Sequence, residues 1–346
     1  MRFLVFNPRR WELVSLNPFD FGLEDFVNPV RAKLEYENFL EKLKELGEVK
    51  DVCDIVEREK LVELVYTSIP TIGEGKIEEK KLEKSILSLD REDLCNLFIL
   101  NPTVIISENE NRKVPKLRVF SEKIRGELMW LHRYALIDKI PVIGFPSIST
   151  SKFEIKFLYY SLKKEINREP LMADYPPSLL NFDDIIIDKL NNLLIAQIGG
   201  STNVEGLSKL FKLRYTTLGE VYLDNNSDKL PIFNFIRFLE KDSVIINKKI
   251  FEKSRVDVYE FTGNNYHFKY TTDLKSFLKL YYKNIIIAEN EDMSFLVNDR
   301  KVLIKEKSKS DELHKIFRDL GLDIITVTMN NLSSTYNGPY NLVIVY

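Results

Sequence analysis

Cysteine and histidine are scarce in this sequence of 346 residues, which contains two cysteines and three histidines. The cysteines are Cys53 and Cys95, and the histidines are His132, His267 and His314. No pair of them has the spacing of metal ligands, so we predict no metal site. With so few cysteines and histidines, most catalytic pairs of a nucleophile and a base also lack the residues that they require. We interpret His132 and His314, which lie in helical patterns, as surface or core residues, and Cys53, in a strand-like stretch, as a buried, inert thiol.

Glycine-rich phosphate loops are absent as well. The glycines at 73–75 and 199–200 lack the spacing of a dinucleotide fingerprint or of a P-loop, so we expect no cofactor. No charge of one sign dominates, because 50 basic and 52 acidic residues give a formal net charge of −2. That balance leaves no electrostatic footprint for nucleic acid, which we therefore do not expect as a partner.

Long hydrophobic runs are missing too. The longest, such as NLLIAQI at 192–198, are too short to cross a bilayer, so we expect no membrane partner. The opening MRFLVF has neither the length nor the small-residue cleavage site of a signal peptide, which predicts a cytoplasmic protein. A hydrophobic content of 44% and a charged content of 29% are those of an ordinary globular chain that can bury a sizeable core.

The chain does contain a repeated order of elements: strand, turn, strand, helix, strand. In the C-terminal repeat a hairpin turns at 298–300, Ser310 caps a helix that Gly321 ends, and a strand follows at 323–327. Two more repeats are expected. The middle one has strands at 185–188 and 193–198, a helix at 201–211 and a strand near 220–223, and the first one has strands at 3–6 and 11–16, a helix at 32–47 and a strand at 50–56.

Two weaker repeats are predicted between these. One runs from a strand at 102–107 through a helix at 125–138 to a strand at 141–145, and the other covers 233–246, a helix at 272–282 and a strand at 284–290. Each unit can bury only one face alone, so the units must pack against one another. A closed ring of mixed β/α units fits this pattern, and a generic pair of α/β domains is the alternative.

Several stretches resemble the arginine deiminases, which belong to the pentein superfamily of enzymes that modify guanidino groups. The resemblance covers nearly the whole chain and is clearest at 34–49, 95–102, 124–136, 181–211, 217–223 and 334–341. It implies an α/β fold, a five-bladed pseudo-symmetric β/α propeller of ββαβ units, as a single domain over 1–346. The helical domain that deiminases insert would be reduced here to about 75–94.

The final loop carries the most informative difference from the family. Arginine deiminases have a pattern similar to Gly-Gly-Pro-Arg-Cys there, in which the cysteine attacks the guanidinium carbon. The matching residues here run from Asn337 to Asn341, so that Tyr340 stands for the substrate-binding arginine and Asn341 for the nucleophile. Attack on a guanidinium requires a strong nucleophile such as a thiolate, which a neutral amide cannot replace.

Other family positions have changed as well. The His-Leu-Asp-Thr motif falls on 217–220, so Thr217 stands for the general acid/base histidine and Gly219 for a substrate-binding aspartate. The Glu-Gly-Gly-Asp motif falls on 181–184, so Asn181 replaces the guanidinium-binding glutamate and Asp184 matches the aspartate. Ser201 stands where a family arginine holds the substrate carboxylate.

One more motif is half retained. In NLFILNP, Asn96 matches the family asparagine, and Asn101 stands where the second guanidinium-binding aspartate is expected. Arg125 matches a further arginine on the substrate side. No catalytic residue is therefore predicted. The changed positions form either a polar pocket for a neutral ligand or a solvent-filled relic.

The resemblance thus implies a catalytically inactive homologue that acts as a binding, scaffold or regulatory protein, with a protein partner or as a homo-oligomer. One alternative is an enzyme of altered chemistry on a guanidino or amide substrate, in which Asp183, Asp184 and Glu220 supply a base or hold a metal. Those acids otherwise lie on the surface or in hairpins. A second alternative is a translation-linked binding protein, because a ribosome factor of archaea and eukaryotes shares the five-bladed fold.

Overall fold

The computed structural model describes residues 1–16, 27–72, 76–108, 115–120, 127–148, 150–174, 177–199, 201–223, 231–240, 242–289, 293–306, 311–332 and 338–346. Five of its sheets share one pairing scheme, in which a first strand runs antiparallel to a middle strand and the chain then crosses over from the middle strand to a parallel third strand. These strand triplets are unit 1 with β20 (Val343–Val345), β1 (Arg2–Val5) and β2 (Glu48–Asp51); unit 2 with β6 (Ala135–Ile137), β7 (Pro141–Ile143) and β8 (Leu171–Met172); unit 3 with β9 (Ile185–Asp188), β10 (Leu193–Gln197) and β11 (Thr217–Tyr222); unit 4 with β12 (Ile236–Glu240), β13 (Ser243–Asn247) and β16 (Asn284–Ala288); and unit 5 with β17 (Leu296–Asn298), β18 (Lys301–Lys305) and β19 (Asp323–Val327).

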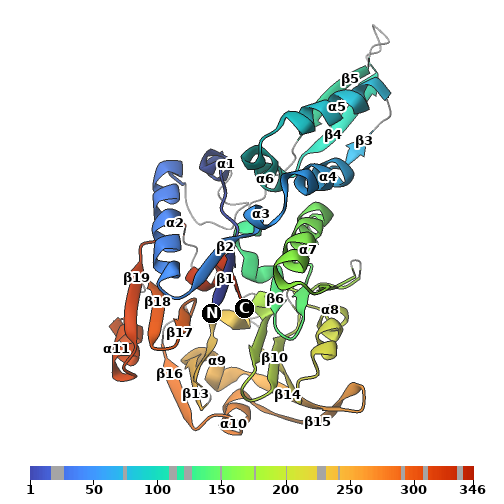
Figure 1. Cartoon of the computed structure of the whole chain (residues 1–346). Helices are drawn as coiled ribbons and strands as arrows, with labels where there is room; N and C mark the ends of the chain where they lie inside the picture. The colour runs from blue at the N-terminus through green and yellow to red at the C-terminus, as the bar shows by residue number, and fades with distance from the viewer. Residues whose placement is uncertain are drawn as a thin grey trace.

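A helical crossover joins the middle strand to the third strand in every unit, as parallel pairing requires. The crossovers are α2 (Pro29–Lys44), α7 (Lys152–Ile166), α8 (Val204–Ser208) with η5 (Lys209–Leu213), α9 (Lys248–Lys253) with α10 (Leu274–Lys279), and α11 (Asp311–Asp319). Figure 1 places the units around the middle of the body, with the two chain ends close together there. The expected α/β architecture with repeated units is confirmed at this level.

The C-terminal repeat matches its prediction most closely. The hairpin turns at Asp299, whose positive φ of 52° suits the tight β17–β18 connection, and Gly321 ends the α11 segment with φ 69°. The third strand is β19. The expected cap Ser310 lies outside the described residues.

The first repeat departs from its prediction in two places. The expected strand at 11–16 is a helix, α1 (Trp11–Leu16). The expected strand at 50–56 ends at Asp51, whose side chain accepts a hydrogen bond from the amide of Cys53 and so starts the short helix α3 (Val52–Ile55). Propensity cannot distinguish such short apolar segments, because tertiary contacts decide their conformation.

The expected helix at 125–138 is wrong for residues 127–138. They form two short turns, η2 (Glu127–Met129) and η3 (Leu131–Arg133), followed by strand β6. The consecutive residues Leu128 to Leu131 are all fully buried, so their apolar run reflects burial on every side rather than one helical face. Unit 2 therefore starts at β6, and the expected first strand at 102–107 belongs to another sheet.

That other sheet lies in a group of elements that protrudes from the body (Figure 1). It contains α4 (Arg58–Ser68), β3 (Thr71–Ile72), α5 (Lys76–Ser88), α6 (Arg91–Leu100), β4 (Thr103–Glu108) and β5 (Pro115–Phe120). A disulfide joins Cys53 in α3 to Cys95 in α6, with their Cα atoms 6.2 Å apart. The prediction of an inert free thiol at Cys53 is wrong, because a sequence separation of 42 gave no sign that the two cysteines meet.

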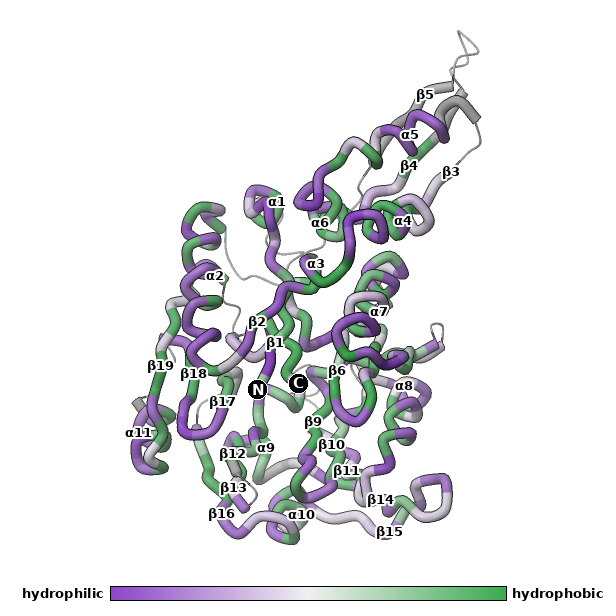
Figure 2. The backbone as a smooth tube through the Cα atoms, in the orientation of Figure 1, coloured by the Kyte–Doolittle hydropathy of each residue, from purple (hydrophilic) through white to green (hydrophobic). Residues whose placement is uncertain are grey.

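A long hairpin links units 3 and 4. Strands β14 (Arg255–Thr262) and β15 (Asn265–Asp273) lie between α9 and α10 in the chain, but β14 pairs antiparallel with β11 of unit 3. Figure 2 shows strongly hydrophobic stretches in the inner strands, and β10 is buried along its whole length. Within the described residues, no helix combines the length and the apolar character that crossing a membrane requires.

Candidate functional site

A short buried segment precedes the first strand of each unit. In four units it contains a 3-10 turn, namely η3, η4 (Phe182–Asp184), η6 (Ile232–Asn234) and η7 (Pro339–Leu342). Turn η3 contacts both η7 and η4, and η4 contacts η6, so segments far apart in the sequence meet in one place. The strand pairing within each unit therefore delivers one pre-strand segment per unit to a common centre.

The residue two positions before each first strand is polar in all five units. We call these five residues the central ring: Arg133, Asp183, Asn234, Ser294 and Asn341. Four of them are buried, whereas the side chain of Arg133 keeps 26% of its surface exposed. Sequence reasoning missed Arg133, Asn234 and Ser294. The available signal was a polar residue two positions before each first strand, within a mostly apolar run.

Hydrogen bonds connect four members of the central ring. Asp183 accepts from Nε of Arg133 at 2.9 Å and from Nδ2 of Asn341 at 3.2 Å. Oδ1 of Asn341 accepts from the hydroxyl of Ser294 at 2.6 Å and from the amide of Gly338 at 3.2 Å. These partners fix the orientation of the Asn341 amide, because its oxygen faces two donors and its nitrogen faces a carboxylate.

The fifth member, Asn234, differs from the others. It is fully buried, and neither atom of its side-chain amide has a hydrogen-bond partner among the described residues. A buried amide without hydrogen-bond partners destabilises a fold by about 1–3 kcal/mol. In native proteins ordered water or a bound molecule usually supplies the missing hydrogen bonds.

Aromatic rings and a second guanidinium pack beside the central ring. The ring of His132 lies 3.9 Å from that of Phe233 and 4.9 Å from that of Tyr340. The guanidinium of Arg237 lies over Phe233 at 3.2 Å and over Tyr340 at 4.7 Å, as in cation–π contacts. Tyr340 thus lies at the centre, where it packs in this cluster.

His132 was interpreted as a surface or core residue in a helix. It is buried in the core, but it lies in the turn η3 beside the central ring rather than in a helix. Burial lowers its pKa to about 3, although the nearby carboxylate of Asp183 acts in the opposite direction. The imidazole is therefore neutral at physiological pH and is a weak base for proton transfer.

Three further expected positions lie close to Asn341. Asn181 begins η4, where its side chain accepts from the amide of Asp183 at 2.9 Å. Thr202 exchanges hydrogen bonds with the Asn181 backbone, which links Ser201 and Thr202 to the same turn. Asp184 is 4% exposed, and burial raises its pKa to about 7, while hydrogen bonds from Thr202 and the Ser201 backbone act against that rise.

Thr217 and Gly219 do not join this group. Strand β9 begins beside Asp184 and runs antiparallel to β10, which runs parallel to β11, so the start of β11 lies at the opposite end of the sheet. There Thr217 accepts a hydrogen bond from the hydroxyl of Tyr281 at 3.1 Å. Gly219 packs under Phe277, where a Cβ atom would approach the ring to 2.7 Å. Both residues thus have structural roles.

Asn96 and Asn101 also have local structural roles. Asn96 accepts from the backbone amide of Arg10 at 3.2 Å, and Asn101 ends α6 in the left-handed conformation with φ 45°. Helix α6 belongs to the protruding group (Figure 1). Arg125 and Asn337 lie outside the described residues, so their expected places in the site stay predictions.

The three carboxylates of the altered-chemistry alternative are all buried. Asp183 is 1%, Asp184 4% and Glu220 9% exposed, so the interpretation of these residues as surface or hairpin acids is wrong. Glu220 lies within β11 and accepts from the hydroxyl of Tyr222 at 3.2 Å. Among the described residues, no group of three or more histidine, cysteine, aspartate or glutamate side chains is arranged to hold a metal ion.

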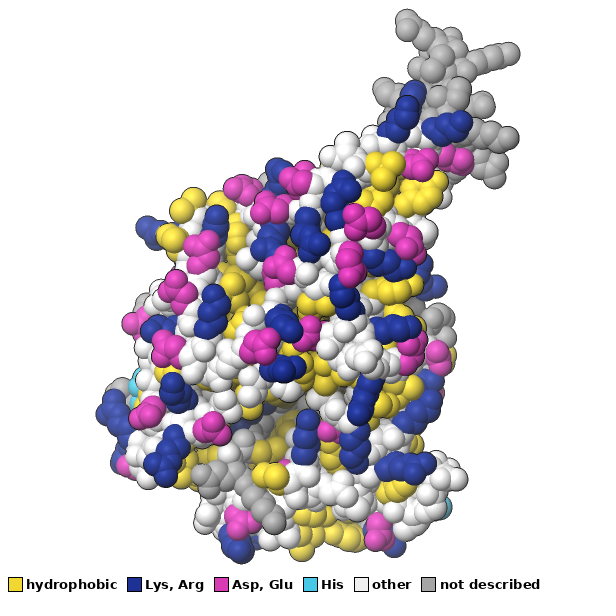
Figure 3. Space-filling view, viewed as in Figure 1, with side chains coloured by type: hydrophobic (Ala, Val, Ile, Leu, Met, Phe, Trp, Pro, Cys, Tyr) yellow, Lys and Arg dark blue, Asp and Glu magenta, His cyan; other side chains and the backbone are white. Residues whose placement is uncertain are grey.

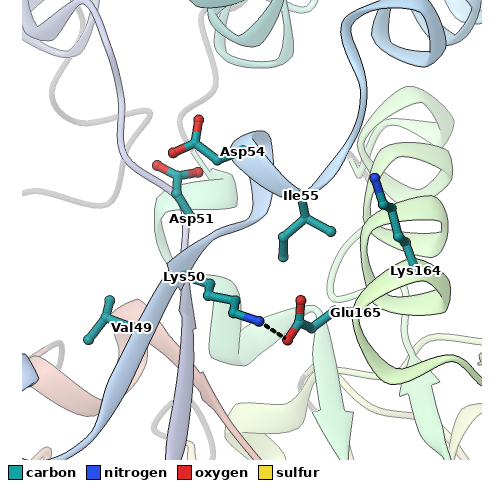
Figure 4. A pocket seen from close by; sticks show the side chains of 7 residues that line it. All are labelled: Val49, Lys50, Asp51, Asp54, Ile55, Lys164 and Glu165. Atoms are coloured by element: carbon teal, nitrogen blue, oxygen red, sulfur yellow. Dashed lines mark hydrogen bonds and ion pairs between the residues drawn. The ribbon is translucent and has the colours of Figure 1, made fainter.

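A separate cleft with a cavity volume of about 460 Å³ lies between β2, α3 and α7 (Figure 4). Its charged side chains pair with one another or with close neighbours. Lys50 donates to Glu165 at 2.8 Å, and Arg9 bridges Asp51 at 3.1 Å and Asp54 at 2.9 Å. Figure 3 shows the same alternation of basic and acidic groups over this face. We interpret the cleft as part of a surface ion-pair network.

No protein-family model matches this chain, and no curated protein matches it in sequence. Solved structures do match. Dimethylarginine dimethylaminohydrolase, as an adduct with 4-chloro-2-hydroxymethylpyridine, has a TM-score of 0.58 at 12% identity over 99% of this chain and 98% of that chain. The enzyme from Pseudomonas aeruginosa, complexed with citrulline, has a TM-score of 0.58 at 9% identity over the same shares.

A third match is the N-terminal domain of ArgZ, a cyanobacterial arginine dihydrolase, with a TM-score of 0.57 at 10% identity over 99% of this chain and 96% of that chain. At these identities the likeness concerns the fold. The chain therefore has an α/β fold similar to that of dimethylarginine dimethylaminohydrolase and of the N-terminal domain of ArgZ, which confirms the α/β class that the sequence resemblance implied.

Proposed function

We propose that this chain is a non-catalytic protein of the pentein fold that acts by binding, as a scaffold or regulatory protein. The supporting observation is Asn341, which stands where the resemblance places the nucleophile and whose amide is held by Ser294, Gly338 and Asp183. A neutral amide that is already hydrogen-bonded on both sides cannot attack a guanidinium carbon.

The rest of the chain offers no ready substitute for the missing thiolate. Its only two cysteines are joined to each other in the disulfide between α3 and α6. The imidazole beside the central ring, His132, is neutral and weakly basic. Thiolate attack assisted by a histidine, which the family uses, therefore lacks a free thiol, and the imidazole at the centre is too weakly basic to assist it.

The direct test is to incubate the purified chain with arginine and with methylated arginines and to measure citrulline and ornithine. We expect no product above a heat-treated sample. A second measurement is the mass and composition of the complex isolated from native cells through a tag. A stoichiometric protein partner supports a scaffold role, whereas measurable turnover of a guanidino substrate would overturn the proposal.

The alternative of an enzyme with altered chemistry has one observation in its favour. Asp184 is buried, with a pKa of about 7, and such a carboxyl can act as a general base or acid near neutral pH. If a product is found, Asp184→Asn should abolish it. Asp174→Asn is the matched control, because the side chain of Asp174 is exposed and pairs with Lys209 at the surface.

Several finer expectations also remain proposals. We propose that the five units close into a five-bladed ring, which their shared pairing scheme and converging turns support. We also propose one domain over 1–346, with segment 75–94 as the remnant of the deiminase insertion. A homo-oligomer and a cytoplasmic location stay predictions. The disulfide weighs against the cytoplasmic location, because the cytoplasm is a reducing compartment.

A further inference from the structure

The central ring contains one ion pair, between Arg133 of unit 2 and Asp183 of unit 3. The Nε atom of Arg133 lies 2.9 Å from Oδ2 of Asp183, within the range of charge-assisted hydrogen bonds. The side chain of Asp183 is 2% exposed, so its charge is almost wholly removed from water. Its other oxygen accepts from Asn341.

We infer that Asp183 is a guanidinium-binding carboxylate whose site is filled from within the chain by Arg133. The guanidinium group is planar and presents several N–H donors in a fixed fork, a geometry suited to a carboxylate. In this chain the neighbouring unit supplies that group, because η3 and η4 contact each other. An external guanidinium would have to displace a side chain that is covalently attached to the same fold.

Access to solvent decides whether the site can be reoccupied. Arg133 keeps 26% of its side-chain surface exposed although its carboxylate partner is buried, so the arginine is the member of the pair that reaches solvent. Shortening Arg133 should therefore leave a cavity that opens outward and ends on a buried carboxylate. Such a carboxylate is strongly destabilising unless a cation enters.

The second guanidinium of the centre does not fill this role. Arg237 is stacked over the rings of Phe233 and Tyr340, whereas Asp183 accepts its hydrogen bond from Arg133. The inference deepens the proposed non-catalytic function, because an internal guanidinium at the central carboxylate excludes a cationic substrate. It concerns binding, however, and its test uses no enzymatic activity.

The experiment is chemical rescue of Arg133→Ala by guanidinium ion. Thermal unfolding is measured at rising millimolar guanidinium chloride, with sodium chloride at equal ionic strength and with urea as comparisons. We expect the variant to unfold at a lower temperature than the unmodified chain. Its unfolding temperature should then partly recover as the guanidinium concentration increases. The unmodified chain should show no such gain, because its site is filled.

Two controls make the readout specific. In the double variant Arg133→Ala, Asp183→Asn the carboxylate is gone, so guanidinium should no longer stabilise. Arg2→Ala removes an arginine from an exposed pair, in which the side chain of Glu48 is 49% exposed, and guanidinium should not stabilise that variant either. The inference would be overturned if guanidinium raised the unfolding temperatures of Arg133→Ala and of the double variant equally, or if it did not raise that of Arg133→Ala.

Arg133→Ser covers the case in which the alanine variant does not fold, because serine leaves the same space open and its hydroxyl can hydrogen-bond to entering water. A folded Arg133→Ser variant that guanidinium fails to stabilise would also count against the inference. Activity of the unmodified chain on a guanidino substrate would overturn the proposed function, whereas the rescue experiment reports on the Asp183 site itself. The two failures are therefore distinguishable.

Discussion

The hydroxyl of Tyr282 donates a hydrogen bond to the carboxylate of Asp188, which joins unit 4 to unit 3. The same contact recurs one unit earlier, where Tyr215 donates to Asp138 at 2.8 Å. In both cases the tyrosine lies two residues before the third strand of its unit. Asp188 is the last residue of the first strand of the preceding unit, and Asp138 directly follows the corresponding strand. The repeated contact fixes neighbouring units at equivalent points.

We predict that Tyr282→Phe destabilises the protein by about 1.5–2 kcal/mol, because it removes a hydrogen bond to a buried charged group while the ring stays in place. Asp188 is 5% exposed and keeps its contacts with the 190–191 turn, which should limit the loss. Chemical denaturation monitored by circular dichroism measures the change. Tyr270→Phe is the control, since its side chain is 43% exposed, and we expect it to change stability by less than about 0.5 kcal/mol.

Reduction of the Cys53–Cys95 disulfide should destabilise the chain. The bridge closes a loop with a sequence separation of 42 residues, for which the chain-entropy model gives about 4 kcal/mol. Calorimetry with and without a phosphine reductant measures the shift in unfolding temperature. The double variant Cys53→Ala, Cys95→Ala should unfold near the reduced chain and should not respond to the reductant. An unchanged unfolding temperature on full reduction would show that the bridge adds nothing to stability.

The raised pKa of Asp184 predicts a pH dependence of stability with a definite sign. The folded state holds this proton up to about pH 7, whereas the unfolded chain releases it near its ordinary pKa of 3.8. The folded state therefore binds more protons between these values, and its stability falls as the pH rises through that window. The loss at pH 8 is on the order of 4 kcal/mol.

Asp184→Asn should remove this loss. The free energy of unfolding of the variant should rise relative to that of the unmodified chain as the pH rises from 4 to 8. Urea denaturation at each pH measures it. Lowering of the His132 pKa to about 3 acts with the opposite sign between that value and its ordinary 6.5, so the difference between the two proteins isolates Asp184. A difference that does not vary with pH would exclude a raised pKa at this residue.

The fold class could be predicted from sequence because strong local signals agree with the tertiary structure in the C-terminal unit. There the turn at Asp299, the helix α11 and the strand β19 coincide with their patterns. The segment 127–138 could not be predicted, because burial on all sides produced an apolar run without a helix. Short segments such as α1 depend on contacts that sequence periodicity does not record.

The candidate site was predictable in part for a similar reason. Asn181, Asp184 and Asn341 lie at turns next to strand starts, where a motif match transfers directly to a position in space. Thr217 lies within a strand at the far end of its sheet, so matching it by motif alone misplaced it. Arg133 comes from a turn that periodicity had assigned to a helix, and its contact with Asp183 depends on how units 2 and 3 pack.

The hydrogen bonds of Asn341 make a sharp prediction for the near-isosteric change Asn341→Asp. The Nδ2 donor to Asp183 would be replaced by a carboxylate oxygen that faces another carboxylate in a buried place. Like charges at such distance cannot both ionise without cost, so the pair should share a proton and one pKa should rise. We expect a loss of roughly 3 kcal/mol at pH 8, because breaking a buried charge network costs this much.

The loss should shrink toward pH 5, where the shared proton is bound. Ser294 and Gly338 still donate to the other oxygen of residue 341, so the fold should be kept at low pH. Urea denaturation at pH 5 and pH 8 measures the effect. Asn191→Asp is the comparison, because its amide also donates to a buried carboxylate, Asp188, at 2.7 Å, but Asn191 itself is half-buried, so solvent screens a charge there better than at Asn341. If both substitutions cost the same at both pH values, the contact between Asn341 and Asp183 does not hold the centre together.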